Sequence, residues 1–138
     1  MTLLEMHAVV DSHHAPIKGF SLNRDCGGSG IFRTASFDLD KTPPKLTPFF
    51  DPGQAGPDAR PYELQPIKFP YRVALTDPEV FWIEGTTVKC DCEWHAEISW
   101  SSKGKSGWVK VDNNGKSFHT SSNAGSKKCS LLDTVQCQ

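Results

Sequence analysis

Cysteines are the side chains with the widest choice of chemistry in this sequence of 138 residues, which contains five of them. Cys90 and Cys92 are separated by one residue, so in an extended segment they point to the same face as Trp94. We interpret both mainly as small buried residues or as halves of disulfide bonds. The candidates for disulfide bonding are Cys26, Cys90, Cys92, Cys129 and Cys137.

Two pairings of these cysteines are attractive on energetic grounds. In the chain-entropy description, a bridge from Cys26 to Cys90 closes a long loop and is worth roughly 4 kcal/mol, and one from Cys129 to Cys137 roughly 2.6 kcal/mol. The spacing alone does not fix the connectivity, and an odd number of cysteines cannot all pair within one chain. Their abundance suggests an oxidising compartment.

A metal site is the alternative use of Cys90 and Cys92. Their thiolates, joined by His13, His14 or His119, would suit zinc or copper. The spacing of these two cysteines is a weaker signal than two Cys-x-x-Cys pairs. His95 falls on the opposite face of the strand and cannot easily join them. Apart from this alternative, we expect no bound cofactor.

Acidic residues and one imidazole occupy the other face of the same segment. They are Asp91, Glu93, His95 and Glu97. We interpret this stripe mainly as the solvated face of an antiparallel sheet. Acid–base chemistry is the alternative, but no nucleophile or pocket accompanies the carboxylates, so the sequence favours a protein that is not an enzyme.

A calcium site is the second possibility that carboxylates raise. Asp38 and Asp40 face the same way and could bind the ion together with Asp112 from a turn. A charged strand face that protects a sheet edge is the interpretation we prefer.

Hydrophobic alternation predicts the elements that carry these residues. Eleven positions from Cys90 to Trp100 alternate without an error, which indicates a half-buried strand. A loop of about five residues and a return strand over 107–112 then form a hairpin. Shorter strands are expected at 7–10, 17–22, 31–40, 67–75 and 80–88, and a surface loop at 51–66. We expect an all-β, antiparallel, immunoglobulin-like β-sandwich of about seven strands.

Composition limits the functions and places open to the chain. We expect one sandwich domain over residues 1–122 and a loosely ordered tail over 123–138. The net charge of −1 argues against binding nucleic acid through phosphate neutralisation. No apolar run is long enough to span a membrane, and the first residues do not resemble a signal peptide. The sequence as written fits the cytoplasm, and an extracytoplasmic location is expected if a targeting segment is missing.

Several motifs resemble those of a family of uncharacterised actinobacterial proteins of the Streptomyces type. The most specific are Cys90-Asp91-Cys92-Glu93-Trp94 and the turn Asp112-Asn113-Asn114-Gly115-Lys116-Ser117-Phe118. The resemblance covers roughly residues 8–122, and it implies a C-terminal β-domain of longer chains, some with a membrane helix or a helix-turn-helix. It implies no activity and no catalytic residues.

A non-catalytic binding or interaction module is therefore the function that the sequence favours. Trp82 and Trp108 are expected on a surface away from the main core, and with His95 they are the candidate binding residues for a protein or a small ligand. Association with the cell envelope is one setting for such a module. The alternatives are a metal-binding domain that uses Cys90 and Cys92, and the sensor domain of a transcriptional regulator.

Overall fold

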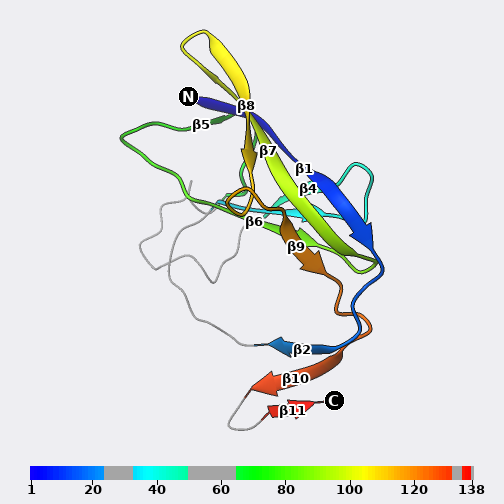
Figure 1. Cartoon of the computed structure of the whole chain (residues 1–138). Helices are drawn as coiled ribbons and strands as arrows, with labels where there is room; N and C mark the ends of the chain where they lie inside the picture. The colour runs from blue at the N-terminus through cyan, green and yellow to red at the C-terminus, as the bar shows by residue number, and fades with distance from the viewer. Residues whose placement is uncertain (24–32, 50–64, 132–134, 138) are drawn as a thin grey trace.

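The fold consists of strands and turns. The computed structural model describes residues 1–23, 33–49, 65–131 and 135–137. Eleven strands form three sheets in this part of the chain, and it contains no helix (Figure 1). The strands are β1 (Thr2–His14), β2 (Phe20–Asn23), β3 (Arg33–Asp38), β4 (Lys45–Phe49), β5 (Tyr71–Arg72), β6 (Phe81–Thr86), β7 (Asp91–Ser102), β8 (Lys105–Val111), β9 (Phe118–Ser121), β10 (Lys127–Leu131) and β11 (Val135–Cys137).

The main sheet is organised around β7. One edge of β7 pairs with β1 along its length, and the other edge pairs first with β9 and then with β8. All these pairs are antiparallel, and β5 adds two residues to the outer edge of β1. Register shifts interrupt the pairing of β1 with β7 between Leu3 and Glu5 and between Val10 and Ser12.

Two tight turns connect β7 to β8 and β8 to β9, the two strands that pair with the second edge of β7. Ser102 pairs with Lys105, so Lys103 and Gly104 alone form the loop, and both have positive φ, 48° and 76°. Two-residue turns of this kind match the twist of antiparallel strands. Asn114 and Gly115 repeat the arrangement, with φ of 53° and 84°, between β8 and β9.

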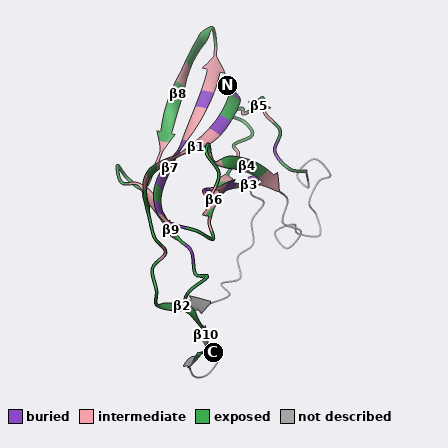
Figure 2. Ribbon diagram, turned by 90° about the vertical axis from the view of Figure 1, so that its right-hand side faces the viewer, coloured by how far each residue is buried: buried purple, intermediate pink, exposed green. Residues whose placement is uncertain are grey.

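A second sheet of β4, β3 and β6 packs against the main sheet. Phe37 from β3 and Trp94 from β7 meet with ring centroids 5.8 Å apart, and both side chains are buried. Figure 2 shows the buried residues gathered along β1, β3 and β7. The core cluster consists of Met6, Ala8, Phe37, Leu39, Cys90, Cys92, Trp94 and Ala96.

A third sheet lies apart from this core, at the lower end of the molecule in Figure 1. It contains β2, β10 and β11, and β2 pairs with β10 in parallel. A strand from the expected sandwich thus pairs with a strand from the expected tail, while the division into domains at residue 122 remains a prediction.

The all-β prediction is confirmed, and several details differ from expectation. The strand count exceeds the expected seven because short strands such as β5 and β11 lack a readable alternation. Two pairs, β3 with β6 and β2 with β10, are parallel. The hairpin loop after β7 has two residues instead of about five. The expected surface loop at 51–66 and Cys26 lie outside the described residues, except for Gln65 and Pro66. No helix in the described part could cross a membrane.

Candidate ligand-binding cleft

An aromatic cleft lies where an edge of the main sheet meets an edge of the second sheet. Its volume is about 360 Å³, within the range of small ligand sites. Two groups of consecutive residues, one from β6 and one from β9, line it together with one ring from β7. The lining residues are Trp82, Ile83, Glu84, Gly85, Trp94, Phe118, His119 and Thr120.

Strand edges form the two walls of this cleft. Successive side chains of a strand point to opposite faces, so a cleft lined by several consecutive residues borders the backbone edge itself. Among the described strands, β6 pairs only with β3, and β9 only with β7. The walls therefore carry backbone donors and acceptors that no described strand uses.

The inner end of the cleft is closed by Trp94. Its indole N–H donates to Thr120 Oγ1 at 2.9 Å, and its ring lies 5.0 Å from that of Phe118, measured between centroids. Gly85 makes room for the ring, because a Cβ at that position would lie 2.7 Å from Trp94 Cε2. The absence of a side chain at Gly85 thus decides how deeply Trp94 can reach between the sheets.

The outer rim of the cleft combines an apolar ring with polar groups. Trp82 is 51% exposed and lies in the lining, so it is accessible to a ligand, and its role in binding remains a prediction. His119 Nε2 and Asp91 Oδ1 are 2.5 Å apart at the opposite wall. Glu84 is the acidic side chain of the described lining, which contains no lysine or arginine. The cleft can therefore hold an apolar group and attract a cation at its rim.

Trp108 belongs to a different surface. It is 53% exposed and lies on β8, where its ring makes an edge-on contact with that of His7 at a centroid distance of 4.9 Å. His7 in turn shares a hydrogen bond with Glu97, across a distance of 2.8 Å. The two tryptophans predicted to bind a ligand are thus not brought together.

A polar network on the outer face of the main sheet holds His95. Its Nδ1 lies 2.9 Å from Asp11 Oδ2, and its Nε2 lies 3.4 Å from Glu97 Oε1. Ser117 also donates to Asp11 Oδ2, at 2.6 Å. Asp11 has no cross-strand partner, because it is the extra residue of the bulge between Val10 and Ser12, and bulges re-aim side chains.

The network lowers the pKa values of both carboxyl groups. Burial raises the pKa of Asp11, but hydrogen bonds from His95 and Ser117 outweigh it, so the pKa falls below its usual value. Hydrogen bonds from His7 and then His95 lower the pKa of Glu97. The prediction that His95 belongs to a solvated stripe is wrong, since it is only 8% exposed and is surrounded by these partners.

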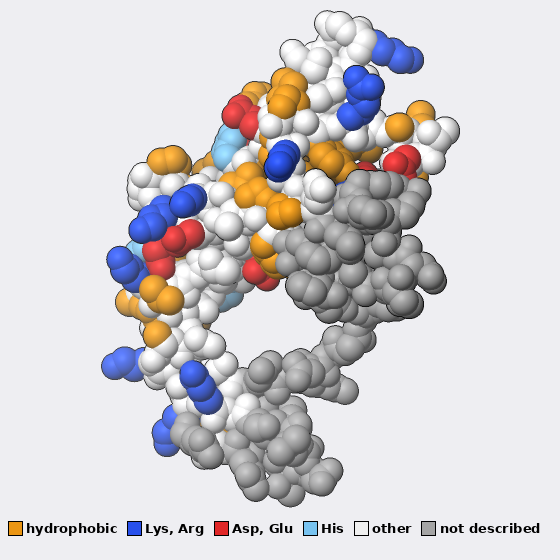
Figure 3. Space-filling view, turned by 180° about the vertical axis from the view of Figure 1, so that it is seen from behind, with side chains coloured by type: hydrophobic (Ala, Val, Ile, Leu, Met, Phe, Trp, Pro, Cys, Tyr) orange, Lys and Arg blue, Asp and Glu red, His pale blue; other side chains and the backbone are white. Residues whose placement is uncertain are grey.

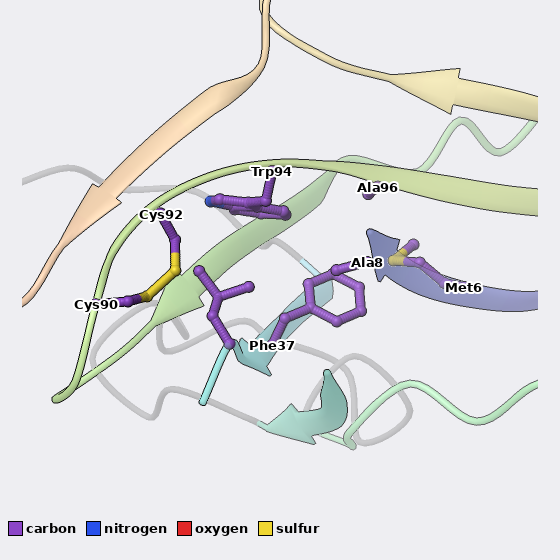
Figure 4. Packing of buried hydrophobic residues seen from close by; sticks show 8 residues of the cluster. Met6, Ala8, Phe37, Cys90, Cys92, Trp94 and Ala96 are labelled. Atoms are coloured by element: carbon purple, nitrogen blue, oxygen red, sulfur yellow. A yellow bond between two sulfur atoms is a disulfide. The ribbon is translucent and has the colours of Figure 1, made fainter. Parts of the chain in front are cut away.

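The sulfur atoms of Cys90 and Cys92 lie to one side of Trp94, where the chain enters β7 (Figure 4). Cys90 and Cys92 form a disulfide bond with each other, and both residues are fully buried. Cys129 and Cys137 form the second disulfide, which is the tail pairing that the sequence suggested. Cys90 is thus bonded to its near neighbour and not to Cys26.

One histidine accompanies this disulfide. A ring nitrogen of His13 and the two Sγ atoms all lie within 4.8 Å of one another, and this is the single such group of three or more metal-ligating side chains among the described residues. His14 and His119 are not in the group. The three acids proposed for calcium are also not brought together in a metal-ligating group.

Each of those acids instead accepts hydrogen bonds from residues of a nearby turn. Asp40 accepts hydrogen bonds from the hydroxyl of Thr87 at 2.6 Å and from the backbone of Val88 at 2.8 Å. Asp38 accepts from the backbone N–H of Asp40, and Asp112 from that of Gly115. Their oxygens serve to fix the backbone.

Two other hollows are less suited to a ligand. The larger, of about 1040 Å³, is lined by residues 1–2, 72–75, 78–79 and 101–103, and none of these described residues is aromatic. The other contains Arg33, whose guanidinium is paired with Glu79 and lies over the Tyr71 ring. Burial and the hydrogen bond to Glu79 raise the pKa of Tyr71 to about 12. This cluster ties β3 to the segment before β6.

Comparison with known proteins assigns no family to the chain. No family model matches it, and neither the curated proteins nor the solved structures give a significant match. The resemblance to actinobacterial proteins therefore remains a prediction.

Sequence reasoning did not identify Gly85, Phe118 or Thr120 as lining residues. A signal for β9 is present directly after a tight turn. Phe118 and Thr120 are partly buried, and His119 and Ser121, which alternate with them, are exposed. What no sequence pattern indicated is that β6 lies beside β9. Figure 3 shows that hydrophobic side chains also gather on the rear face, among acidic and basic ones, so exposed apolar groups alone do not locate the cleft.

Proposed function

We propose that this chain is a non-catalytic binding module that holds an extended peptide segment of a partner protein in the cleft between β6 and β9. The observation that carries the proposal is the lining of the cleft by consecutive residues of two strands. Since side chains alternate in direction along a strand, such a lining indicates that the cleft borders the strand edges. A peptide strand added to such an edge gains main-chain hydrogen bonds, and alternate side chains supply specificity.

The exposed tryptophan supports this choice of occupant. An edge strand that presents large apolar side chains invites pairing with another chain, and proteins usually protect such edges with charge or proline. β6 instead presents the half-exposed ring of Trp82, and β3 is the single described strand with which β6 pairs. A peptide strand placed there would cover the ring and lie along the edge of β6 that faces away from β3.

Charge indicates which peptides are favoured. Glu84 is exposed at the rim, and the described lining offers no cation. A peptide with alternating apolar residues and one lysine or arginine opposite Glu84 would satisfy both parts of the cleft. The proposal does not depend on an immunoglobulin-like arrangement of the sheets, which stays a prediction, as do a regulatory sensor role and a place in the cell envelope.

The two exposed tryptophans provide a matched test. Linear peptides would be selected from a displayed random library, and the affinity of a selected peptide would be measured by calorimetry for the unmodified protein, Trp82→Ala and Trp108→Ala. We expect Trp82→Ala to weaken binding by about tenfold or more, as for buried aromatic anchors, and Trp108→Ala to change it by less than about twofold. The reverse ranking would place binding on the outer face and contradict the proposal.

A second measurement separates strand addition from other modes of binding. Bound peptide should slow amide hydrogen exchange in β6 and β9, and N-methylation of alternate peptide nitrogens should abolish binding. Sedimentation of the protein alone tests whether a second copy fills the cleft. A stable dimer that Trp82→Ala dissociates would replace the partner peptide by another copy of this chain.

A further inference from the structure

We propose that the Cys90–Cys92 disulfide is the closed state of a redox-gated site for a thiophilic metal ion, which the two sulfurs and the His13 imidazole bind once the disulfide is reduced. The observation is the meeting of three ligand atoms within 4.8 Å, two of them on buried sulfurs. The inference is independent of the peptide-binding cleft.

Pairing of β1 with β7 brings the histidine to the sulfurs. His13 is the cross-strand partner of Cys92, in the register that follows the bulge between Val10 and Ser12. Its neighbour His14 is paired with Asp91 and points to the opposite face, because side chains alternate along a strand. The bulge thus selects one of two adjacent histidines.

Hydrogen bonds on both sides fix the backbone of Cys90. Its N–H donates to Thr87 Oγ1 at 3.0 Å, and its carbonyl accepts from the N–H of Ser122 at 2.8 Å. Cys92 is held within the ladder between β1 and β9. Both sulfurs are therefore presented by a rigid frame, as a preorganised metal site requires.

The donor set decides which ions fit. Two thiolates and one imidazole are soft or borderline ligands, which select copper(I) or zinc(II) over magnesium or calcium. Copper(I) would use the three ligands alone. Zinc(II) would balance the two thiolate charges and leave a fourth, open position, since it prefers four ligands. Copper(I) and zinc(II) are both thiophilic ions, and either would be bound by Cys90, Cys92 and His13.

Opening of the site is a two-electron step. A thiolate of an external thiol attacks one sulfur to form a mixed disulfide, and a second thiol releases it. The products are two cysteine thiols in the protein and one disulfide of the reductant, which is itself oxidised. Metal binding then displaces the thiol protons, because the thiolate is the ligand.

Adjacent histidines supply the test and its control. The full chain would be treated with a thiol or phosphine reductant without denaturant, the reductant removed anaerobically, and copper(I) or zinc(II) titrated against a chromophoric chelator. We expect one ion per chain for the reduced protein and none for the oxidised protein. His13→Ala should weaken binding by about tenfold or more, whereas His14→Ala should leave it unchanged.

Further variants keep the outcome clear. The background Cys26→Ser, Cys129→Ser, Cys137→Ser leaves Cys90 and Cys92 as the sole thiols, so an ion bound there reports on this pair. Stronger binding of copper(I) than zinc(II), or the reverse, identifies the ion. Equal affinities of the His13 and His14 variants, equal binding by the oxidised protein, or a disulfide that is reduced only on unfolding would each overturn the proposal.

Discussion

The ring of Trp94 lies so close to Gly85 that no side chain fits between them. A Cβ at Gly85 would be 2.7 Å from Trp94 Cε2 and 2.9 Å from Leu39 Cδ1. Contacts below 3.0 Å force a shift of the ring or the backbone. Because Gly85 has no side chain, β6 of the second sheet can approach the Trp94 ring of the main sheet closely. The same contact sets the inner limit of the cleft.

Substitution of Gly85 tests this relationship. We expect Gly85→Ala to lower the free energy of unfolding by about 1–3 kcal/mol, the usual cost of overpacking a core. Urea unfolding followed by tryptophan fluorescence measures it. Gly19→Ala is the control, because a Cβ there meets nothing within 4 Å. Equal effects of the two changes would show that the close contact does not constrain the fold.

The hydrogen bond from Trp94 to Thr120 provides a second test of the same ring. Thr120→Val keeps the shape of the side chain and removes the acceptor, which leaves a buried indole N–H unsatisfied. We expect a loss of about 1–3 kcal/mol in the free energy of unfolding. Thr120→Ser retains the hydroxyl and should recover most of the stability. If valine and serine behave alike, packing and not the hydrogen bond is what Thr120 supplies.

Local sequence patterns predict individual strands and turns, but they do not predict which strands lie side by side in the fold. The alternation of β7 and the Asn-Gly turn are decided by neighbouring residues, so both could be predicted from the sequence. β1 was recognised only at residues 7–10, because its two register shifts break the alternation of a strand that runs from Thr2 to His14. The cleft depends on contacts between β6 and β9, which are distant in the chain, and no local pattern encodes them.

The candidate site residues show the same limit. The sequence predicts an exposed Trp82 because the residue falls on the strand face opposite the main core, but its separation from Trp108 depends on which sheet each strand joins. His13 and His14 were equivalent by sequence, and the bulge in β1 decides between them. His95 was placed on a solvated face because alternation reports side-chain direction and not what covers that face.

Asp40 provides a test of the turn that leads into the cysteine segment. Its carboxylate accepts hydrogen bonds from Thr87, Val88 and Lys89, at 2.6, 2.8 and 3.3 Å. We expect Asp40→Ala to cost about 1.5–3 kcal/mol of unfolding free energy, as for hydrogen bonds to a charged group. Asp77→Ala removes an exposed acid and should change stability by less than about 0.5 kcal/mol. A thermal transition unchanged by Asp40→Ala would contradict this account of the turn.

Acid titration tests the network around His95. Burial raises the pKa of Asp11, but the hydrogen bonds from His95 and Ser117 lower it by more, so the net pKa is below its usual value. The carboxyl group of Asp11 therefore binds a proton less tightly in the folded protein than in the unfolded chain. The resulting stabilisation is present above the unfolded pKa of about 4 and is lost as the pH falls through the folded value. The free energy of unfolding should therefore begin to decrease as the pH falls below about 5, and it should continue to decrease until the pH is below the lowered pKa of folded Asp11.

The variant Asp11→Asn isolates this contribution. Asparagine does not titrate, so the fall in unfolding free energy with acid should be shallower than in the unmodified protein, with the difference greatest above about pH 4. Hydrogen bonds from His7 and then His95 also lower the pKa of Glu97, so Asp11→Asn should flatten the curve only in part, and Asp11→Asn with Glu97→Gln should flatten it further. A slope that neither variant alters would mean that the bonds seen around His95 do not persist in solution.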